Sequence, residues 1–173
     1  MEQLKLTRTH VKAPILKRAS ILLVGECVQD IFPKIHKQFA KERVVLTSCP
    51  EAENIGLIIG KTATILACSR PREVTVLTID GSPHCFMLHA ALNQAMFVTK
   101  EKTPTRHFVI ADGKALEVSA ESIRVGRYLH LVQKCVQKHP KILQELDRYS
   151  LEQRCSRKTV SYTHLRAHET GRN

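Results

Sequence analysis

The chain has 173 residues, of which 43% are hydrophobic, 25% charged and 5% aromatic. This length supports one compact domain with a short appendage, and the composition excludes a disordered chain, a collagen and a disulfide-bonded mini-protein. No apolar segment approaches the roughly 18 residues of a membrane span, and residues 1–20 lack the apolar core of a signal peptide. We therefore expect a cytoplasmic protein whose six cysteines are thiols or ligands rather than structural disulfides.

The net charge of +11 is concentrated at the two ends of the chain. Residues 1–19 hold five Lys and Arg against one Glu, whereas residues 20–123 hold eleven charges of each sign. Residues 124–158 hold nine basic and three acidic side chains. A neutral centre with few aromatic residues offers little surface for base stacking, so we do not expect a nucleic-acid partner.

The first half of the chain alternates strands with helical patterns. Residues 3–9 alternate as an edge strand does, and residues 21–25 form an apolar run typical of a strand buried on both faces. Apolar residues recur at spacings of four along residues 30–41, which predicts a helix that Pro33 could begin. Residues 43–47 predict the next strand.

The second half continues the alternation. Asn54 can cap a helix that extends toward residue 68, and residues 73–79 predict a strand. A helix is expected over residues 86–96, and a further strand over residues 106–111.

The predicted chain ends in a hairpin and a helical extension. Asp112-Gly113 turns the strand of residues 106–111 toward residues 115–118 as a short hairpin. Together these elements predict a three-layer α/β sandwich with a mostly parallel sheet of about four to five strands, an antiparallel edge hairpin and a C-terminal helical extension. We expect the α/β domain to span residues 1–123 and one or two amphipathic helices to occupy residues 124–158.

Three cysteines follow three predicted parallel strands: Cys27, Cys49 and Cys85. In open α/β sheets the carboxyl ends of the strands line the ligand crevice, so thiols at neighbouring strand ends can converge on one site. Thiolates suit soft centres, which predicts an iron–sulfur cluster or a soft metal ion such as zinc. His84, and His36 one helix along, are candidates for a fourth ligand. The competing interpretation is that these cysteines are small core residues.

The remaining cysteines are Cys68, Cys135 and Cys155. Cys68 closes a predicted helix and the other two lie in the C-terminal helices, so we expect all three to be structural or incidental.

These residues resemble the domain that follows the ferredoxin-type motif in four-iron four-sulfur binding proteins of anaerobic bacteria. Val11-Lys-Ala-Pro14 and Ala19-Ser-Ile-Leu-Leu-Val-Gly-Glu-Cys27 are similar to that family's "VNAP" and "ADLLIAADC". Arg43-Val-Val-Leu-Thr-Ser-Cys-Pro50 parallels "ITLIGCPK", Val74-Thr-Val-Leu77 parallels "VTVV", and Phe108-Val-Ile-Ala-Asp-Gly113 parallels "VVTISTDG". The resemblance covers residues 3–118 and implies redox or metal-associated work with a redox protein as partner.

The chain also departs from that family. Where the family has "VPCCGG", this chain has Ser82-Pro-His-Cys-Phe-Met87, so one cysteine is replaced by His84. The C-x-x-C-x-x-C run of ferredoxins is absent, so the ferredoxin cluster sites have no counterpart here. What the resemblance implies for this chain is a metal or iron–sulfur site at Cys27, Cys49 and Cys85, with His84 as a possible fourth ligand.

Residues 160–173 resemble the read-through translation of a sequencing adapter, beginning Val160-Ser-Tyr-Thr-His-Leu-Arg-Ala-His-Glu-Thr170. We therefore expect residues 159–173 to be an artefact, and we do not interpret His164 and His168 as ligands despite their i, i+4 spacing.

Two other functions fit the sequence. A thiol-dependent or zinc-dependent small α/β enzyme is one alternative, because a cysteine at a helix N-terminus has a stabilised thiolate. The other is an interaction module, in which Arg127, Lys134, Lys138 and Lys141 form one basic stripe, provided that Pro140 does not break the helix. The motifs favour a protein without catalytic activity of its own.

Overall fold

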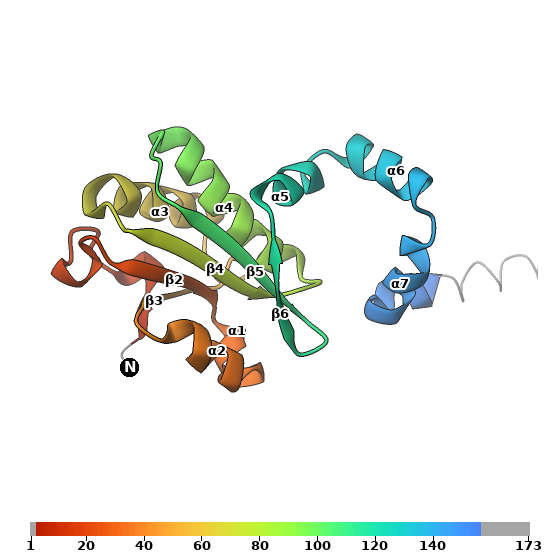
Figure 1. Ribbon diagram of the computed structural model, residues 1–173, viewed down its shortest axis with the longest axis horizontal. Coiled ribbons are helices and arrows are strands. Elements are labelled where there is room, and N and C mark those ends of the chain that lie inside the picture. Colours follow the sequence, from red (N-terminus) through yellow and green to blue (C-terminus); the bar gives the residue numbers. More distant parts are fainter. Residues whose placement is uncertain (1–2, 157–173) are drawn as a thin grey trace, which may run out of the picture. The chain divides into compact units, whose positions relative to one another are not determined.

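The computed structural model describes residues 3–156 of the chain. They divide between Arg127 and Tyr128 into two compact units, an α/β body and a helical C-terminal unit (Figure 1).

The body is built on a six-stranded sheet with the strand order β1-β3-β2-β4-β5-β6. The strands are β1 (Gln3–Lys5), β2 (Ser20–Gly25), β3 (Val44–Ser48), β4 (Glu73–Ile79), β5 (Thr105–Ala111) and β6 (Lys114–Val118). Neighbouring strands are parallel except for β6, which is antiparallel to β5. The predicted α/β class is confirmed, and the sheet has six strands rather than four to five because both short edge strands pair with their neighbours.

Helices cover both faces of this sheet (Figure 1). They are α1 (Cys27–Ile31), α2 (Pro33–Ala40), α3 (Ile55–Ser69) and α4 (Pro83–Thr99). The helices α1 and α2 pack on one face, and α3 and α4 pack on the other. This arrangement is the predicted three-layer sandwich.

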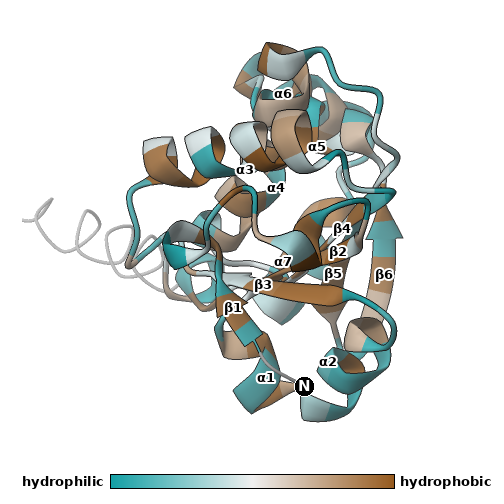
Figure 2. Ribbon diagram, turned by 90° about the vertical axis from the view of Figure 1, so that its left-hand side faces the viewer, coloured by the Kyte–Doolittle hydropathy of each residue, from teal (hydrophilic) through white to brown (hydrophobic). Residues whose placement is uncertain are grey.

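Alternating residues of the central strands build two separate cores. On β2, Ile21 and Leu23 belong to the core under α3 and α4. Leu22 and Val24 belong to the core under α1 and α2. Figure 2 shows hydrophobic residues along the central strands and mixed colours on the covering helices. A strand that is buried on both faces must be apolar at every position, which explains the unbroken apolar run of β2.

Phe32 and Asn54 each lie directly before a helix and mark where α2 and α3 begin. The expectation that Pro33 could begin a helix is confirmed, since Pro33 is the first residue of α2. Residues 30 and 31 belong instead to α1, because Pro33 disfavours helical backbone at the preceding residue and cannot donate a hydrogen bond. Phe32 accordingly has φ −129° and ψ 58°, and it separates α1 from α2. The predicted cap of α3 is confirmed, since Asn54 Oδ1 accepts a hydrogen bond from Leu57 N at 3.2 Å.

The helix α4 begins earlier than the expected residue 86. Ser82 caps it by accepting a hydrogen bond from Cys85 N, and Pro83 occupies the first helical position, where its missing N–H costs nothing. Cys85 therefore lies in the first turn of α4. The expected edge strand over residues 3–9 is also shorter, because the 3₁₀ turn Leu6–Arg8 follows β1 and buries Leu6 in the core.

The last elements of the body are the hairpin and α5 (Ala120–Gly126). Asp112 (φ 48°) and Gly113 (φ 70°) both have left-handed backbone, as a two-residue type I′ turn requires. Ile123 of α5 is buried, and a Cβ on Gly126 would meet Phe86 Cε2 at 3.1 Å. This packing places α5 in the body, so the body ends four residues later than expected from the sequence.

The C-terminal unit contains α6 (Leu129–Lys138) and α7 (Ile142–Tyr149). Pro140 separates them, so Lys141 lies outside both helices and the basic side chains do not form the single helical stripe considered above. Residues 157–173, which include the whole adapter-like tail, lie outside the described residues. In the part of the chain that the structure describes, no helix is long and apolar enough to cross a membrane.

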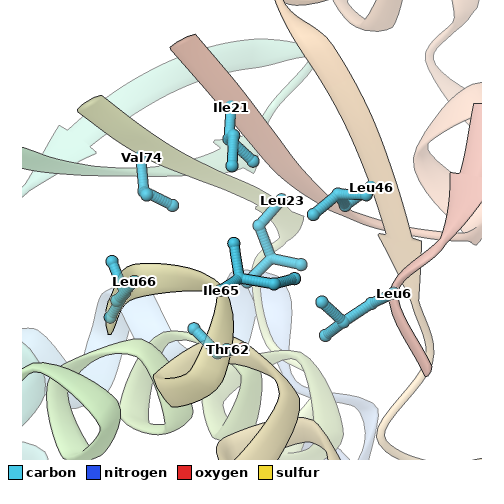
Figure 3. A pocket seen from close by; sticks show the side chains of 8 residues that line it. All are labelled: Leu6, Ile21, Leu23, Leu46, Thr62, Ile65, Leu66 and Val74. Carbon is cyan, nitrogen blue, oxygen red and sulfur yellow. The ribbon is translucent and has the colours of Figure 1, made fainter. Parts of the chain in front are cut away.

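A small cavity of about 10 Å³ lies between the sheet and α3, and Figure 3 shows the eight side chains that line it. Among them is Thr62, whose buried Oγ1 has no hydrogen-bond partner in residues 3–156. We expect Thr62→Val to raise the free energy of unfolding by about 1 kcal/mol, because it replaces an unsatisfied hydroxyl with a methyl group of similar shape. Urea unfolding would measure the change.

Thr64→Val is the matched control on the same helix. Thr64 is exposed, and its Oγ1 donates a hydrogen bond to Gly60 O at 2.7 Å, so this variant should not raise the free energy of unfolding. A loss of stability in Thr62→Val would contradict the prediction, since it would mean that the hydroxyl has a partner.

Candidate functional site

The connections of the sheet create a topological switch point at the carboxyl ends of its central strands. From β2 the chain passes through α1 and α2 to β3 on one side, and from β3 it passes through α3 to β4 on the other side. The direction of winding therefore reverses at β2. Ligands of open α/β sheets bind at such a switch point, outside the carboxyl ends of the strands.

The three predicted site cysteines all lie at this edge of the sheet. Cys27 begins α1 just after β2, Cys49 directly follows β3, and Cys85 lies in the first turn of α4 after β4. The three strands are direct neighbours in the order β3-β2-β4. The loops are also joined, because Glu26 N donates a hydrogen bond to Ser48 O at 3.3 Å.

The thiol of Cys85 interacts electrostatically with both other cysteines. Burial raises the pKa of Cys85, and the thiols of Cys27 and Cys49 raise it further. Hydrogen bonds to Ser82 and to the backbone of Ile79 act in the opposite direction but do not cancel the increase. Cys27 is exposed to solvent, while Cys49 and Cys85 are half-buried.

The two histidine candidates are engaged elsewhere or buried. His84 Nδ1 lies 3.8 Å from Glu51 Oε2, which links the start of α4 to the loop that carries Cys49. His36 is buried in α2, and burial lowers its pKa. Within residues 3–156 no three His, Cys, Asp or Glu side chains form a group that could hold a metal ion.

Glu53 organises the loop of Cys49, a role that the sequence analysis did not assign. Its Oε2 accepts hydrogen bonds from Ser48 Oγ at 2.7 Å and from Cys49 N at 3.0 Å, and its Oε1 accepts one from Thr7 Oγ1. Burial alone would raise the pKa of Glu53, but these hydrogen bonds and the charge of Lys5 lower it overall. The only sequence feature that could have indicated this role is the position of Glu53 just before the capping residue Asn54.

A buried chain of polar side chains lies behind the carboxyl half of β4. Thr78 Oγ1 is 2.8 Å from His89 Nε2, and His89 Nδ1 is 3.1 Å from His107 Nδ1. Burial lowers the pKa of His89 to about 3, helped by His107, and lowers the pKa of His107 to about 4, helped by Arg124. Both rings are therefore neutral, with one Nδ1–H donating to the other Nδ1. The three residues are far apart in sequence, so no local pattern indicates their contact.

The other cysteines do not belong to this edge. Cys68 ends α3 beside its last residue, Cys135 lies in α6, and Cys155 lies beyond α7, and all three are exposed. They are matched controls for experiments on the three strand-end thiols.

A family model described as a Rossmann-like domain matches residues 13–163 of this chain. No curated protein and no solved structure matches it. The family match agrees with the doubly wound sheet, whereas the chemistry of the site depends on its own side chains.

Proposed function

The chain belongs to the Rossmann-like domain family, and from this premise we propose that its switch-point edge holds an iron–sulfur cluster on Cys27, Cys49 and Cys85. The protein would then act as a redox or accessory protein for a redox partner. The observation that supports the proposal best is the placement of three cysteines at the ends of three adjacent strands, with Cys85 interacting electrostatically with both others.

The donor set fits a cluster better than a single zinc ion. Thiolates suit both groups, but a structural zinc site needs four protein ligands. His84, the candidate fourth ligand, has its Nδ1 3.8 Å from Glu51 Oε2, so the proposal is built on the three thiols alone. Three thiolates can hold a four-iron cluster and leave one iron open to an external ligand. When bound, such a cluster supplies one-electron transfer.

The side chains around the thiols would each have a distinct task. Glu53 holds the backbone of Cys49 in place through the Cys49 N–H. Ser82 fixes the first turn of α4, on which Cys85 lies. Cys27 is exposed, so its ligand position is the one nearest to an approaching partner.

Anaerobic reconstitution of the full chain with ferrous iron and sulfide tests the proposal. We expect iron and sulfide in equal amounts, on the order of four of each per chain, together with visible charge-transfer absorption. The triple variant Cys27→Ser, Cys49→Ser, Cys85→Ser should lose this loading. The control triple variant Cys68→Ser, Cys135→Ser, Cys155→Ser should keep it, and thermal unfolding would verify that both variants are folded.

Two results would overturn the cluster. Equal loading in the two triple variants would show that the strand-end thiols are not its ligands. Stoichiometric zinc binding without sulfide uptake, lost in the first variant only, would assign the edge to a single zinc ion instead.

The alternative of a thiol-dependent enzyme has less support. A nucleophilic cysteine needs a lowered pKa, whereas burial and two neighbouring thiols raise the pKa of Cys85. His84, the nearest histidine in sequence, interacts with Glu51.

A further inference from the structure

A broad hollow of about 500 Å³ lies at the opposite edge of the sheet, where the parallel strands begin. Ser20 at the start of β2 and Val44 at the start of β3 lie in its wall. Its charged lining residues are Lys17, Arg18, Glu42, Arg43 and Arg72. At about 3.3 Å per residue, β4 alone separates this edge from the thiol edge by roughly 20 Å. The hollow is therefore distinct from the proposed cluster site.

Most of the cations in this hollow are unpaired. Arg43 Nε lies 3.2 Å from Glu73 Oε1, and its guanidinium also donates to Phe39 O at 2.9 Å. The side chains of Lys17, Arg18 and Arg72 have no ion pair or hydrogen bond within residues 3–156. The hollow thus gathers positive charge at one edge of the body, and it draws on the basic residues 1–19 as well as on residues 20–123, which are neutral as a whole.

The backbone that carries these side chains is held in place. Arg18 N donates to Ser69 O at 3.0 Å, and Arg72 N donates to Ala19 O at 2.9 Å. Arg18 (φ 52°) and Glu42 (φ 59°) both have left-handed backbone, which is costly for residues other than glycine. Such conformations persist only where the surrounding structure enforces them, and they concentrate at ligand sites.

We propose that this hollow binds the phosphate chain of a small polyphosphorylated ligand, such as a nucleoside diphosphate or triphosphate. The planar guanidinium group matches phosphate oxygens in bidentate geometry. The three unpaired cations outnumber the one unpaired carboxylate of the described lining, Glu42, so the hollow attracts the negative charge of a phosphate chain. The volume falls in the range of small-molecule sites. No aromatic side chain is among its described lining residues, so the hollow lacks the stacking platform of a single-strand nucleic-acid groove.

Calorimetric titration of the full chain at low ionic strength tests this site, with tripolyphosphate, pyrophosphate, ADP and ATP as probes. The variant Arg18→Gln, Arg72→Gln removes two unpaired cations but keeps both backbone hydrogen bonds. We expect it to weaken tripolyphosphate binding about 100-fold, taking about tenfold for each charge-assisted contact. The control variant Arg8→Gln, Lys114→Gln removes two exposed charges elsewhere and should bind as the unmodified chain does.

The outcomes separate the possible ligands. Equal weakening in both double variants would reduce the effect to overall charge and overturn the proposal. Absence of tripolyphosphate binding, or binding of single-stranded RNA alone, would overturn it as well. Tighter binding of ADP or ATP than of the inorganic chains would identify a nucleotide, whereas equal binding would identify the polyphosphate itself. None of these results depends on iron or on the cysteines.

Discussion

Lowering the pH from 7 to 5 should reduce the free energy of unfolding by about 4 kcal/mol, because two buried histidines resist protonation in the folded protein. His89 and His107 are almost fully buried, and their Nδ1 atoms share one hydrogen bond. Protonating either ring would place a charge between α4 and the sheet, and protonating the accepting ring would also remove the acceptor of that bond.

The direction follows from the pKa values of the two states. In the unfolded chain both histidines titrate near 6.5, whereas in the folded protein the pKa is about 3 for His89 and about 4 for His107. Between pH 6.5 and pH 4 the unfolded state therefore binds more protons, and stability falls as the pH falls. Each histidine contributes about 2 kcal/mol over the interval from pH 7 to 5. The lowered pKa of His36 acts in the same direction.

Urea unfolding at pH 7, 6 and 5 measures this dependence. The variant His89→Gln retains a neutral hydrogen-bonding side chain but removes one titrating group, so its loss between pH 7 and 5 should shrink to about 2 kcal/mol. The control His130→Gln replaces an exposed histidine of α6 and should keep the full dependence. The charged neighbours Glu121 and Arg124 remain in both variants. A stability that stays flat over this pH range would contradict the buried, neutral pair.

Glu53→Ala should lower the free energy of unfolding by about 2–3 kcal/mol. The substitution removes a carboxylate that accepts hydrogen bonds from Thr7, Ser48 and Cys49 N, and it leaves three donors without their partner. Hydrogen bonds to a charged acceptor each contribute about 1.5–3 kcal/mol, and water can replace part of the loss at this half-buried position. Urea unfolding at pH 7 measures the change.

Glu51→Ala is the matched control in the same loop. Glu51 is exposed and contacts only the His84 ring at 3.8 Å among the contacts that the structure shows for it, so its removal should change stability by less than about 0.5 kcal/mol. If the proposed function is correct, Glu53→Ala should also weaken iron loading about tenfold, because Glu53 holds the backbone of the ligand Cys49 in place through the Cys49 N–H. Equal free energies of unfolding for Glu53→Ala and Glu51→Ala would show that Glu53 does not organise this loop.

The predicted elements correspond to the structure where one local signal dominates. The buried run of β2, the capping Asn54 and the Asp112-Gly113 turn each specify their own conformation, because burial, capping and left-handed backbone act over a few residues. Where two local signals compete, the ends of the helices differ from the predicted ends. Pro33 splits one helix, and Ser82 with Pro83 starts another three residues early.

The candidate site was predictable only in part. Three cysteines after three strands could be read from the sequence, because parallel strands connected by helices place their carboxyl ends on one edge. The organising role of Glu53 required the fold, since Thr7 reaches it from 46 residues away. The contact of His84 with Glu51 also joins two different loops, so it could not be read from the sequence.

The sequence by itself determined the α/β class, the parallel sheet with its edge hairpin and the placement of three thiols at strand ends, because these depend on local periodicity and chain order. Only the tertiary structure decided the order β3-β2-β4, the neutral pair of His89 and His107, and the gathering of Arg18, Arg43 and Arg72 around one hollow. Each of these joins residues from separate strands and loops, and their contact is set by how the sheet winds rather than by any segment alone.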